Sequence, residues 1–294
     1  MIRSAPTRGR AKSFFAKREE IRKMISFRLA FSCGRGYFNL FTIPGLFPRR
    51  ADIFPLFANE FFCGKNILFK EPIMNTPEIK WIDVETWARK THFQSFTTFS
   101  KCLIHATQKL DLTSFYAMCK TTGHRLFPST VAVVAHAANQ IPEFRMVLSP
   151  ENKPGIWNFV SPVYSIFHDD DKTFSSICTT YDNNMETLYR SIVSDMERYK
   201  DVKGHIVTEV PPNLLPTSCE ADLDFTSFHI QPIGEAVYMQ IVAPTIIWGR
   251  MTDDGNRKTM PMTVSINHAA ADGYHISRFF SLLQELLDST DTFA

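Results

Sequence analysis

An imidazole and a carboxylate lie four residues apart in the sequence Asn267-His268-Ala269-Ala270-Ala271-Asp272-Gly273. A free imidazole has a pKa of about 6.5, so a histidine is mostly neutral near pH 7 and can accept a proton. This layout therefore predicts a general base, His268, whose loop is supported by an acid, Asp272. The simpler interpretation of a histidine at a strand end is a hydrogen-bonded structural residue.

The segments on either side of this motif predict the elements that position it. Upstream, residues 260–266 alternate as a half-buried strand does, and the sequence Asp253-Asp254-Gly255-Asn256 predicts a turn that joins them to residues 243–250 in a hairpin. Downstream, apolar residues recur at the spacing of one helix face: Ile276, Phe279, Phe280, Leu283 and Leu287. His268 is thus expected at a strand end, with Asp272 and Gly273 in the turn into a helix.

The motif resembles His-His-x-x-x-Asp-Gly of the chloramphenicol acetyltransferase family, in which the second His is the catalytic base. Asn267 and His268 stand at the two His positions, followed by Asp272 and Gly273. The resemblance extends from Met74 to about Asp288. Other segments match landmarks of that family in the same order: Trp87-Ala88-Arg89-Lys90-Thr91-His92-Phe93, Pro142-Glu143-Phe144-Arg145-Met146, Phe167-His168 with Thr173-Phe174-Ser175, and Asp224-Phe225-Thr226-Ser227-Phe228.

The resemblance implies an antibiotic-resistance enzyme that moves an acetyl group from acetyl coenzyme A to a hydroxyl of chloramphenicol or a related acceptor. It implies that His268 takes the hydroxyl proton and that Ser227 donates a hydrogen bond to the oxyanion of the tetrahedral intermediate. Asp272 corresponds to a residue that forms a buried ion pair with an arginine, matched by Arg89, and so fixes the loop of the base. The implied mechanism uses neither a metal nor a covalent acyl-enzyme.

Substrate binding and assembly are implied in the same way. Phe96 and Cys102 fall where family members line the antibiotic pocket, although ordinary core packing explains these residue types equally well. The resemblance also implies a cytoplasmic homotrimer with active sites at subunit boundaries, where His268 of one chain faces a pocket that comes largely from its neighbour. The expected partners are a small-molecule acceptor and copies of the same chain, with no nucleic acid and no membrane.

Several positions depart from the family pattern. Asn267 replaces the first His, Ser265 stands where many relatives have Gln, and Ile247 stands where many have Thr. Ala271 replaces a frequent Cys, and the sequence Glu220-Ala221-Asp222-Leu223 replaces the usual Pro-Trp. These departures put the identity of the acceptor in question more than the type of reaction. An enzyme acting weakly on chloramphenicol, or on another hydroxylated compound, fits them as well as an efficient resistance enzyme.

The order of predicted elements indicates the fold class. Strands and helices alternate without a strict βαβ pattern, which favours an α/β two-layer sandwich with a mixed β-sheet, as in coenzyme A-dependent acyltransferases, over a doubly wound fold. The predicted helices are 87–99, a helix that follows Asp111 as its N-cap and stops at Gly123, 129–140, 185–200 and the closing helix. The predicted strands include 157–167, 174–180 and an extended stretch from about 222 to 264.

Charge separates the chain into two parts. Residues 1–73 carry 14 Lys and Arg against 5 Asp and Glu, a net charge of +9, so residues 74–294 must carry −7 for the chain to reach +2. The first part also holds 12 of the 26 Phe, without the apolar run of a secretory signal or membrane span. We therefore expect a basic, Phe-rich N-terminal extension over residues 1–73, disordered or arising from an over-extended reading of the gene, and one acetyltransferase domain over residues 74–294. A transit peptide, or a basic tail that contacts nucleic acid or anionic lipid, is the other interpretation.

Three other functions remain open at the level of sequence. Acyl transfer in the manner of a dihydrolipoamide acyltransferase core uses similar logic, but that family normally adds a lipoyl domain and a hinge rich in Ala and Pro. A metal site at His268, Asp272 and His275 requires all three on one continuous helix. The departures also fit a non-catalytic binding module. The six cysteines lack zinc-like spacing and are expected to be reduced cytoplasmic thiols.

Overall fold

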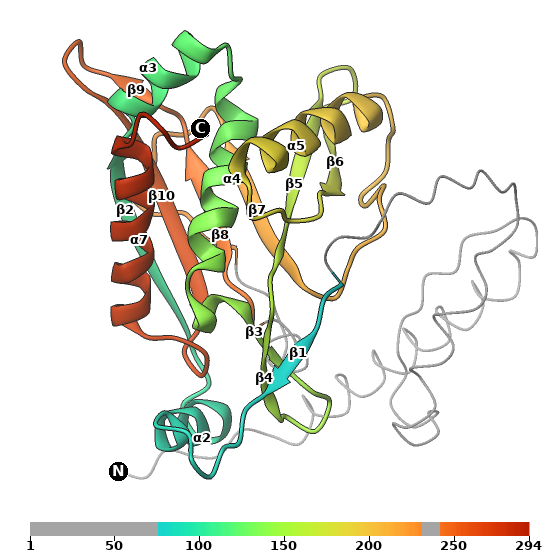
Figure 1. Cartoon of the computed structure of the whole chain (residues 1–294), viewed down its shortest axis with the longest axis vertical. Helices are drawn as coiled ribbons and strands as arrows, with labels where there is room; N and C mark the ends of the chain where they lie inside the picture. Colours follow the sequence, from blue (N-terminus) through green and yellow to red (C-terminus); the bar gives the residue numbers. More distant parts are fainter. Residues whose placement is uncertain (1–75, 231–241, 294) are drawn as a thin grey trace, which may run out of the picture. The chain divides into compact units, whose positions relative to one another are not determined.

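The computed structural model describes residues 76–230 and 242–293 of the 294-residue chain. The predicted extension, residues 1–73, lies outside the described residues. Within the described part, one layer of helices covers one face of a mixed sheet (Figure 1). This arrangement confirms the predicted α/β two-layer sandwich.

The sheet is mixed because β7 runs parallel to both of its neighbours while the remaining pairs are antiparallel. β10, the longest strand, lies between β2 and β8 and is buried along most of its length. The strand order is β2 (Leu103–Asp111), β10 (Lys258–Asn267), β8 (Thr245–Gly249), β7 (Leu214–Glu220), β5 (Ser161–His168) and β6 (Thr173–Cys178), with β9 (Thr252–Asp253) paired to β10.

The helices of the second layer are α3 (Thr113–Thr122), α4 (Leu126–Asn139), α5 (Met185–Tyr199) and α7 (Gly273–Asp288). Of these, α7 packs on β2, α4 on β5 and α5 on β6. α4 also contacts both α5 and α7, which explains why it is buried on almost every side and reads as a nearly continuous apolar run. α2 (Lys90–Thr98) lies beyond the end of the sheet, near the start of α7 (Figure 1).

A second, smaller sheet has three strands among the described residues. It contains β1 (Ile79–Trp81), β4 (Pro154–Trp157) and β3 (Met146–Leu148), with η1 (Pro142–Arg145) leading into β3. None of the helices in residues 76–230 and 242–293 is long and apolar enough to cross a membrane.

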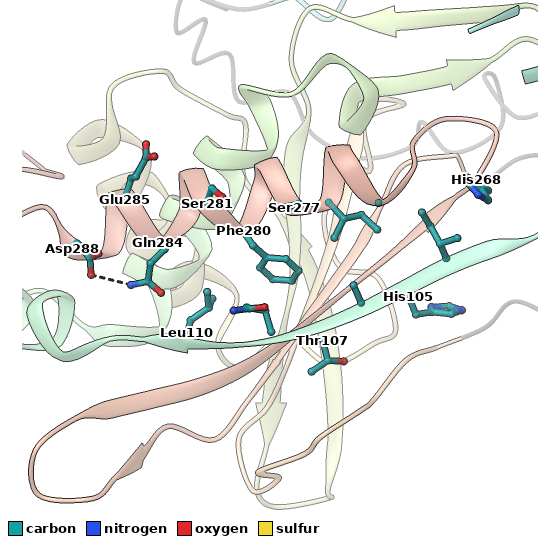
Figure 2. A pocket seen from close by; sticks show the side chains of 15 residues that line it. His105, Thr107, Leu110, His268, Ser277, Phe280, Ser281, Gln284, Glu285 and Asp288 are labelled. Carbon is teal, nitrogen blue, oxygen red and sulfur yellow. Dashed lines mark hydrogen bonds between the residues drawn. The ribbon is translucent and has the colours of Figure 1, made fainter. Parts of the chain in front are cut away.

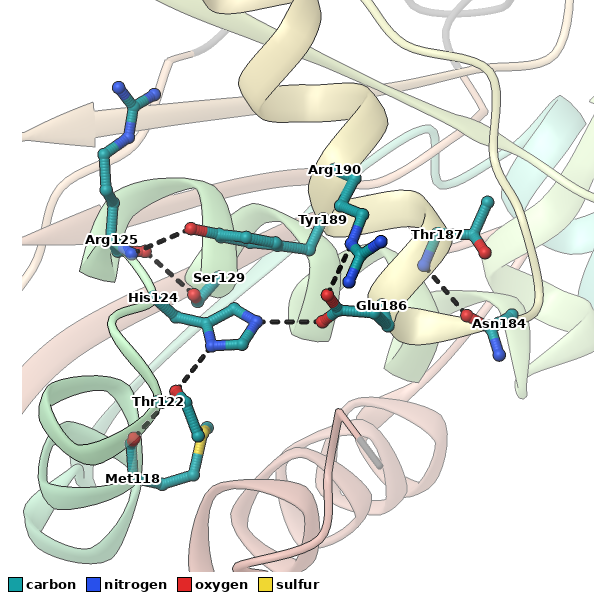
Figure 3. A network of polar contacts seen from close by, with 10 residues as sticks. All are labelled: Met118, Thr122, His124, Arg125, Ser129, Asn184, Glu186, Thr187, Tyr189 and Arg190. Atoms are coloured by element: carbon teal, nitrogen blue, oxygen red, sulfur yellow. Dashed lines mark hydrogen bonds and ion pairs between the residues drawn. The ribbon is translucent and has the colours of Figure 1, made fainter.

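A polar network joins the α3–α4 connection to α5 (Figure 3). His124 lies 2.9 Å from the Glu186 carboxylate through Nε2 and 2.5 Å from the Thr122 hydroxyl through Nδ1. Arg190 donates to the same carboxylate at 2.6 Å. These bonds fix α5 against the start of α4.

Most predicted elements are present, with shifted ends. The hairpin of β8 and β10 and the apolar face of α7 are confirmed, as all five predicted face residues are buried. Gly123 ends α3 in the left-handed conformation, with φ of 78°. The N-cap of α3 is Leu112 rather than Asp111, but the Asp111 carboxylate accepts from the Thr113 backbone N–H at 2.9 Å.

Two strand predictions were wrong in detail. The predicted strand 157–167 is split between β4 and β5, and residues 221–230 form no strand although an extended run was expected. In the latter segment the rings of Phe225 and Phe228 pack 5.6 Å apart. Residues three apart point to opposite faces of a regular strand, so this contact requires an irregular path.

Candidate active site

His268 is held by the ends of two adjacent strands. β10 pairs with β2 in a register that sets Asn267 opposite Leu103, and the backbone N–H of His268 donates to the Cys102 carbonyl at 3.0 Å. β10 ends there, and the chain turns through three buried alanines, residues 269–271, before α7 begins at Gly273. The predicted strand end, turn and helix are therefore confirmed.

The hydrogen bond made by the His268 ring defines which nitrogen is basic. Nδ1 lies 3.0 Å from the backbone carbonyl oxygen of Ala271. A carbonyl oxygen can only accept, so Nδ1 carries the hydrogen, and Nε2 of the neutral ring keeps its lone pair. The ring of Phe96 stacks on this imidazole, with centroids 3.7 Å apart and an angle of 17° between the planes. Nε2 is thus the atom that can accept a proton.

Asp272 links the start of α7 to the start of α2. Its carboxylate accepts from Arg89 Nη1 at 2.5 Å, and Arg89 is the N-cap residue of α2. The same carboxylate accepts from the Tyr274 backbone N–H at 3.2 Å and lies 2.8 Å from His275 Nδ1, so it also caps α7. Burial opposes ionisation of this carboxylate, but the hydrogen bond from Arg89 and the charge of His275 outweigh it and hold the pKa of Asp272 below its ordinary value.

The ion pair is largely shielded from solvent. The side chains of Arg89 and Asp272 are 14% and 32% exposed. Nε and Nη2 of Arg89 are buried and have no hydrogen-bond partner within residues 76–230 and 242–293. Asp272 contacts Arg89 and His275, whereas the His268 ring bonds the Ala271 carbonyl, so the acid supports the turn of the base rather than the imidazole itself.

Cys102 adjoins the base, because its backbone carbonyl accepts from the His268 N–H. Burial raises the pKa of the Cys102 thiol above its ordinary value, so the group is a protonated thiol near neutral pH. A thiol in this state is a poor nucleophile, and its half-buried surface suits an apolar pocket wall. Phe96 is half-buried and lies directly against His268.

Ser227 lies in an irregular segment that is fixed at both ends. The Arg250 backbone N–H donates to the Leu223 carbonyl at 2.7 Å, and a Cβ at Gly249 would overlap that carbonyl oxygen. Beyond Ser227, the ring of His229 stacks on His105 of β2 with centroids 4.2 Å apart. Ser227 itself is exposed, and it makes no hydrogen bond to His268 in the part of the chain that the structure describes. Its oxyanion role stays a prediction.

A groove of about 680 Å³ runs from His268 along α7 between this helix and β2. Figure 2 shows His268 at one end and Asp288 at the other. Ile104, Leu110 and Phe280 provide apolar surface, while Ser277, Ser281 and Gln284 on α7 provide hydroxyl and amide groups. The described lining contains Glu285 and Asp288 but neither Lys nor Arg, so it suits an extended uncharged group better than a phosphate.

A polar ladder between β2 and β10 was not predicted from the sequence. His105 Nδ1 lies 2.7 Å from the Ser265 hydroxyl, and the hydroxyls of Thr107 and Thr263 are 2.6 Å apart. Burial, together with the neighbouring His229, lowers the pKa of His105, so this ring is neutral near pH 7. In the sequence, Ser265 stood out only as a departure from the family pattern. Its partner, His105, can be found only from the register of β2 against β10.

The geometry contradicts the metal site considered from sequence. α7 begins at Gly273, so His268 and Asp272 precede the helix and do not share a helix face with His275. The described ranges contain no group of three His, Cys, Asp or Glu side chains that could hold a metal ion.

Comparisons with known proteins give a consistent result. The sequence profile described as "Chloramphenicol acetyltransferase" matches residues 78–284. A chloramphenicol acetyltransferase of Clostridium perfringens is 33% identical over 212 residues, which cover 72% of this chain and 95% of that protein. Chloramphenicol acetyltransferase 3 of Escherichia coli is 30% identical over 208 residues, covering 70% and 96%. A solved chloramphenicol acetyltransferase structure superimposes with a TM-score of 0.62 at 23% identity over 71% of this chain and 99% of that one, which shows a common fold.

Proposed function

Because the chain belongs to the chloramphenicol acetyltransferase family and is an acetyltransferase, we propose that His268 is its general base. The observation that carries this proposal is the hydrogen bond from Nδ1 to the Ala271 carbonyl, which leaves Nε2 free to accept a proton. The His268 side chain lines the groove between α7 and β2, where a substrate hydroxyl can reach it.

The proposed donor is acetyl coenzyme A and the proposed acceptor is chloramphenicol, the compound named in the relatives, or a similar hydroxylated molecule. His268 Nε2 takes the hydroxyl proton as the oxygen attacks the thioester carbonyl. The tetrahedral intermediate then expels the coenzyme A sulfur, which receives that proton as the acetate ester forms. The imidazole takes the proton while neutral and returns it as imidazolium, so the chemistry of this chain needs no covalent acyl-enzyme. The protonated Cys102 thiol is in keeping with this, since a thiolate nucleophile is absent at that position.

Three supporting roles complete the proposed site. Ser227 would donate to the oxyanion, and the anchoring of its segment at Leu223 and His229 supports this role because a donor must be fixed before charge develops. Arg89 and Asp272 hold the turn that carries His268. Phe96 and Cys102 would form part of the acceptor pocket wall beside the base.

The departures from the family pattern place the acceptor in question. Ile247 is fully buried in β8 opposite Thr263, so it offers no hydroxyl to bind a water near the reacting atoms. The Ser265 hydroxyl bonds His105. We therefore expect the acceptor preference to differ from that of relatives that have Thr and Gln at these two positions.

The proposal is tested by following free thiol with acetyl coenzyme A and a panel of acceptors: chloramphenicol, other hydroxylated antibiotics and dihydrolipoamide. We expect thiol release that requires a hydroxyl acceptor, an unchanged rate when a chelator is added, and growth of a sensitive host on chloramphenicol. A folded protein that releases thiol with none of the hydroxyl compounds contradicts the proposal, and release with dihydrolipoamide alone favours the lipoyl-type acyltransferase. Reaction without an acceptor would indicate simple thioester hydrolysis.

Self-association as a homotrimer is part of the same proposal. The outer edge of β2 pairs with no strand in residues 76–230 and 242–293, and two buried donors of Arg89 lack acceptors there. Phe99 at the C-terminal end of α2 and Tyr274 at the start of α7 are large aromatic side chains that are 86% and 69% exposed.

Light scattering should give the mass of three chains, and a monomer at working concentration contradicts this part. If His268 of one chain faces Ser227 of its neighbour, mixed oligomers of His268→Ala and Ser227→Ala chains should regain activity that neither parent has. Mixed oligomers that stay inactive would place both residues in one subunit's site.

A further inference from the structure

Asn267 is the last residue of β10 and is only 1% exposed. Its side-chain Oδ1 accepts from the backbone N–H of Ala269 at 2.9 Å. Its backbone carbonyl accepts from the N–H groups of Ala270 and Ala271 at 2.9 and 3.2 Å. One residue therefore receives three hydrogen bonds from the short turn that follows the strand, and that turn contains His268.

We propose that Asn267 is a positioning residue that sets the tautomer of His268, an inference that rests on the proposed function only for its effect on catalysis. The Ala269 bond fixes the turn immediately after His268, and the Ala270 and Ala271 bonds fix the chain as it closes. This places the Ala271 carbonyl 3.0 Å from His268 Nδ1. The carbonyl holds the hydrogen on Nδ1, so Asn267 acts on Nε2 through the backbone of the turn.

The chemistry of the side chain explains why asparagine suits this position. The bond to Ala269 needs an acceptor near the backbone, and Asn Oδ1 lies three bonds from Cα. Nδ1 of a histidine lies the same three bonds from Cα, and a neutral imidazole can accept there. Asparagine in place of the first His of the family motif therefore keeps the acceptor in a similar place while removing a second ring from the buried turn.

A buried asparagine with a purely structural role should affect the stability of the fold but not the tautomer of His268. The amide of Asn139 provides a comparison, because it is also buried and its Oδ1 accepts from the Val160 backbone N–H at 2.8 Å. Asn139 lies in α4 and Val160 precedes β5, neither of which belongs to the turn of the base. Losing this amide should lower stability without changing the His268 ring.

The test compares Asn267→Leu and Asn267→Asp, which have nearly the shape of asparagine, in the full-length chain with Asn139→Leu as control. Leucine lacks the acceptor, whereas an aspartate oxygen accepts in either protonation state. Selective ¹⁵N labelling of histidine, with His268 assigned by its loss in His268→Ala, reports the tautomer directly. We expect the Nδ1–H form in the parent, Asn267→Asp and Asn139→Leu, and a mixture of both forms in Asn267→Leu.

Kinetics provide the second measurement. Asn267→Leu should lower kcat about 3- to 10-fold, the effect of losing one backbone hydrogen bond, with little change in the acceptor KM. Asn139→Leu should leave kcat unchanged. An Asn267→Leu chain that keeps the Nδ1–H form overturns the inference. If that variant does not fold, a mixed tautomer in folded Asn267→Asp overturns it instead. A folded parent in the Nδ1–H form that transfers no acetyl group overturns the proposed function and leaves this inference standing.

Discussion

Replacing His268 with alanine is expected to lower kcat for acetyl transfer by about 10²- to 10⁴-fold, the range that a general base supplies. The expected loss follows from the position of Nε2, the ring atom left with a lone pair once Nδ1 donates to the Ala271 carbonyl. No other part of this mechanism removes the hydroxyl proton, so the loss should appear in kcat. The acceptor KM should change little, because Phe96 and Cys102 remain.

The stability of the variant decides how this result is interpreted. His268 is half-buried, and its removal deletes one hydrogen bond and a ring contact with Phe96, so we expect only a modest fall in melting temperature. His92→Ala is the matched control, since His92 is exposed on α2, the same helix that carries Phe96. Steady-state rates of all three proteins, measured under identical conditions, provide the comparison. A His268→Ala protein that retains more than a tenth of the parent kcat would contradict the assignment.

The elements around the base were predictable because their signals are local. The apolar spacing of α7, the turn residues before β10 and Gly123 after α3 all act within a few residues. A helix face repeats every 3.6 residues and a left-handed C-cap favours glycine whatever the rest of the chain does. The motif at residues 267–273 lies between two such elements, so its strand, turn and helix could be read in order.

The contacts that complete the site join distant parts of the chain. Arg89 and Asp272 are 183 residues apart, and His105 and Ser265 are 160 apart. Nothing local pairs them, because the first pair depends on where α2 lies relative to α7 and the second on the register of β2 against β10. The first was reached only through the family resemblance, and the second was missed.

The segment carrying Ser227 shows a different limit of prediction from sequence, because its residue types favour a structure that it does not adopt. Its Phe and Thr residues favour a strand, but the packing of Phe225 on Phe228 and the close approach of Leu223 to Gly249 impose an irregular path. Tertiary contacts here override the intrinsic preference, which single-sequence patterns cannot report. The role of Asn267 was hidden for a similar reason, since only the structure shows that its side chain bonds the turn of the base.

Asp272→Asn is expected to lower both the stability and the activity of the protein. The change removes the charge that faces Arg89 but keeps a good N-cap residue for α7, so it isolates the ion pair. Exposed pairs contribute about 0–1 kcal/mol, and removing one partner of a fully buried pair costs about 3–5 kcal/mol. For side chains 14% and 32% exposed, we expect a loss of about 1–3 kcal/mol in the free energy of unfolding.

Two further variants separate the contributions of this carboxylate. Asp272→Ala also removes the helix cap, which should cost about 0.5–2 kcal/mol more than Asp272→Asn. Arg89→Met removes the cation instead, and a double-mutant cycle with Asp272→Asn measures the coupling between the two side chains. Urea unfolding of the parent, of Asp272→Asn, Asp272→Ala and Arg89→Met, and of the double variant supplies these values. Additive effects of the two single changes would show that the pair does not stabilise the fold.

Acid should remove the contribution of the Arg89–Asp272 ion pair to the free energy of unfolding, because the carboxylate becomes protonated. Because the pKa of Asp272 is held below its ordinary value in the folded protein, the unfolded chain binds the proton more readily. The ion pair therefore contributes fully above the unfolded pKa of about 3.9 and is lost as pH falls through the folded pKa. The unfolding free energies of the parent and Asp272→Asn should differ at pH 6 and converge below about pH 4. A difference that persists undiminished at pH 3 would mean that the Asp272→Asn change disturbs the turn of the base by the shape or hydrogen bonding of the new amide, and not by the missing charge.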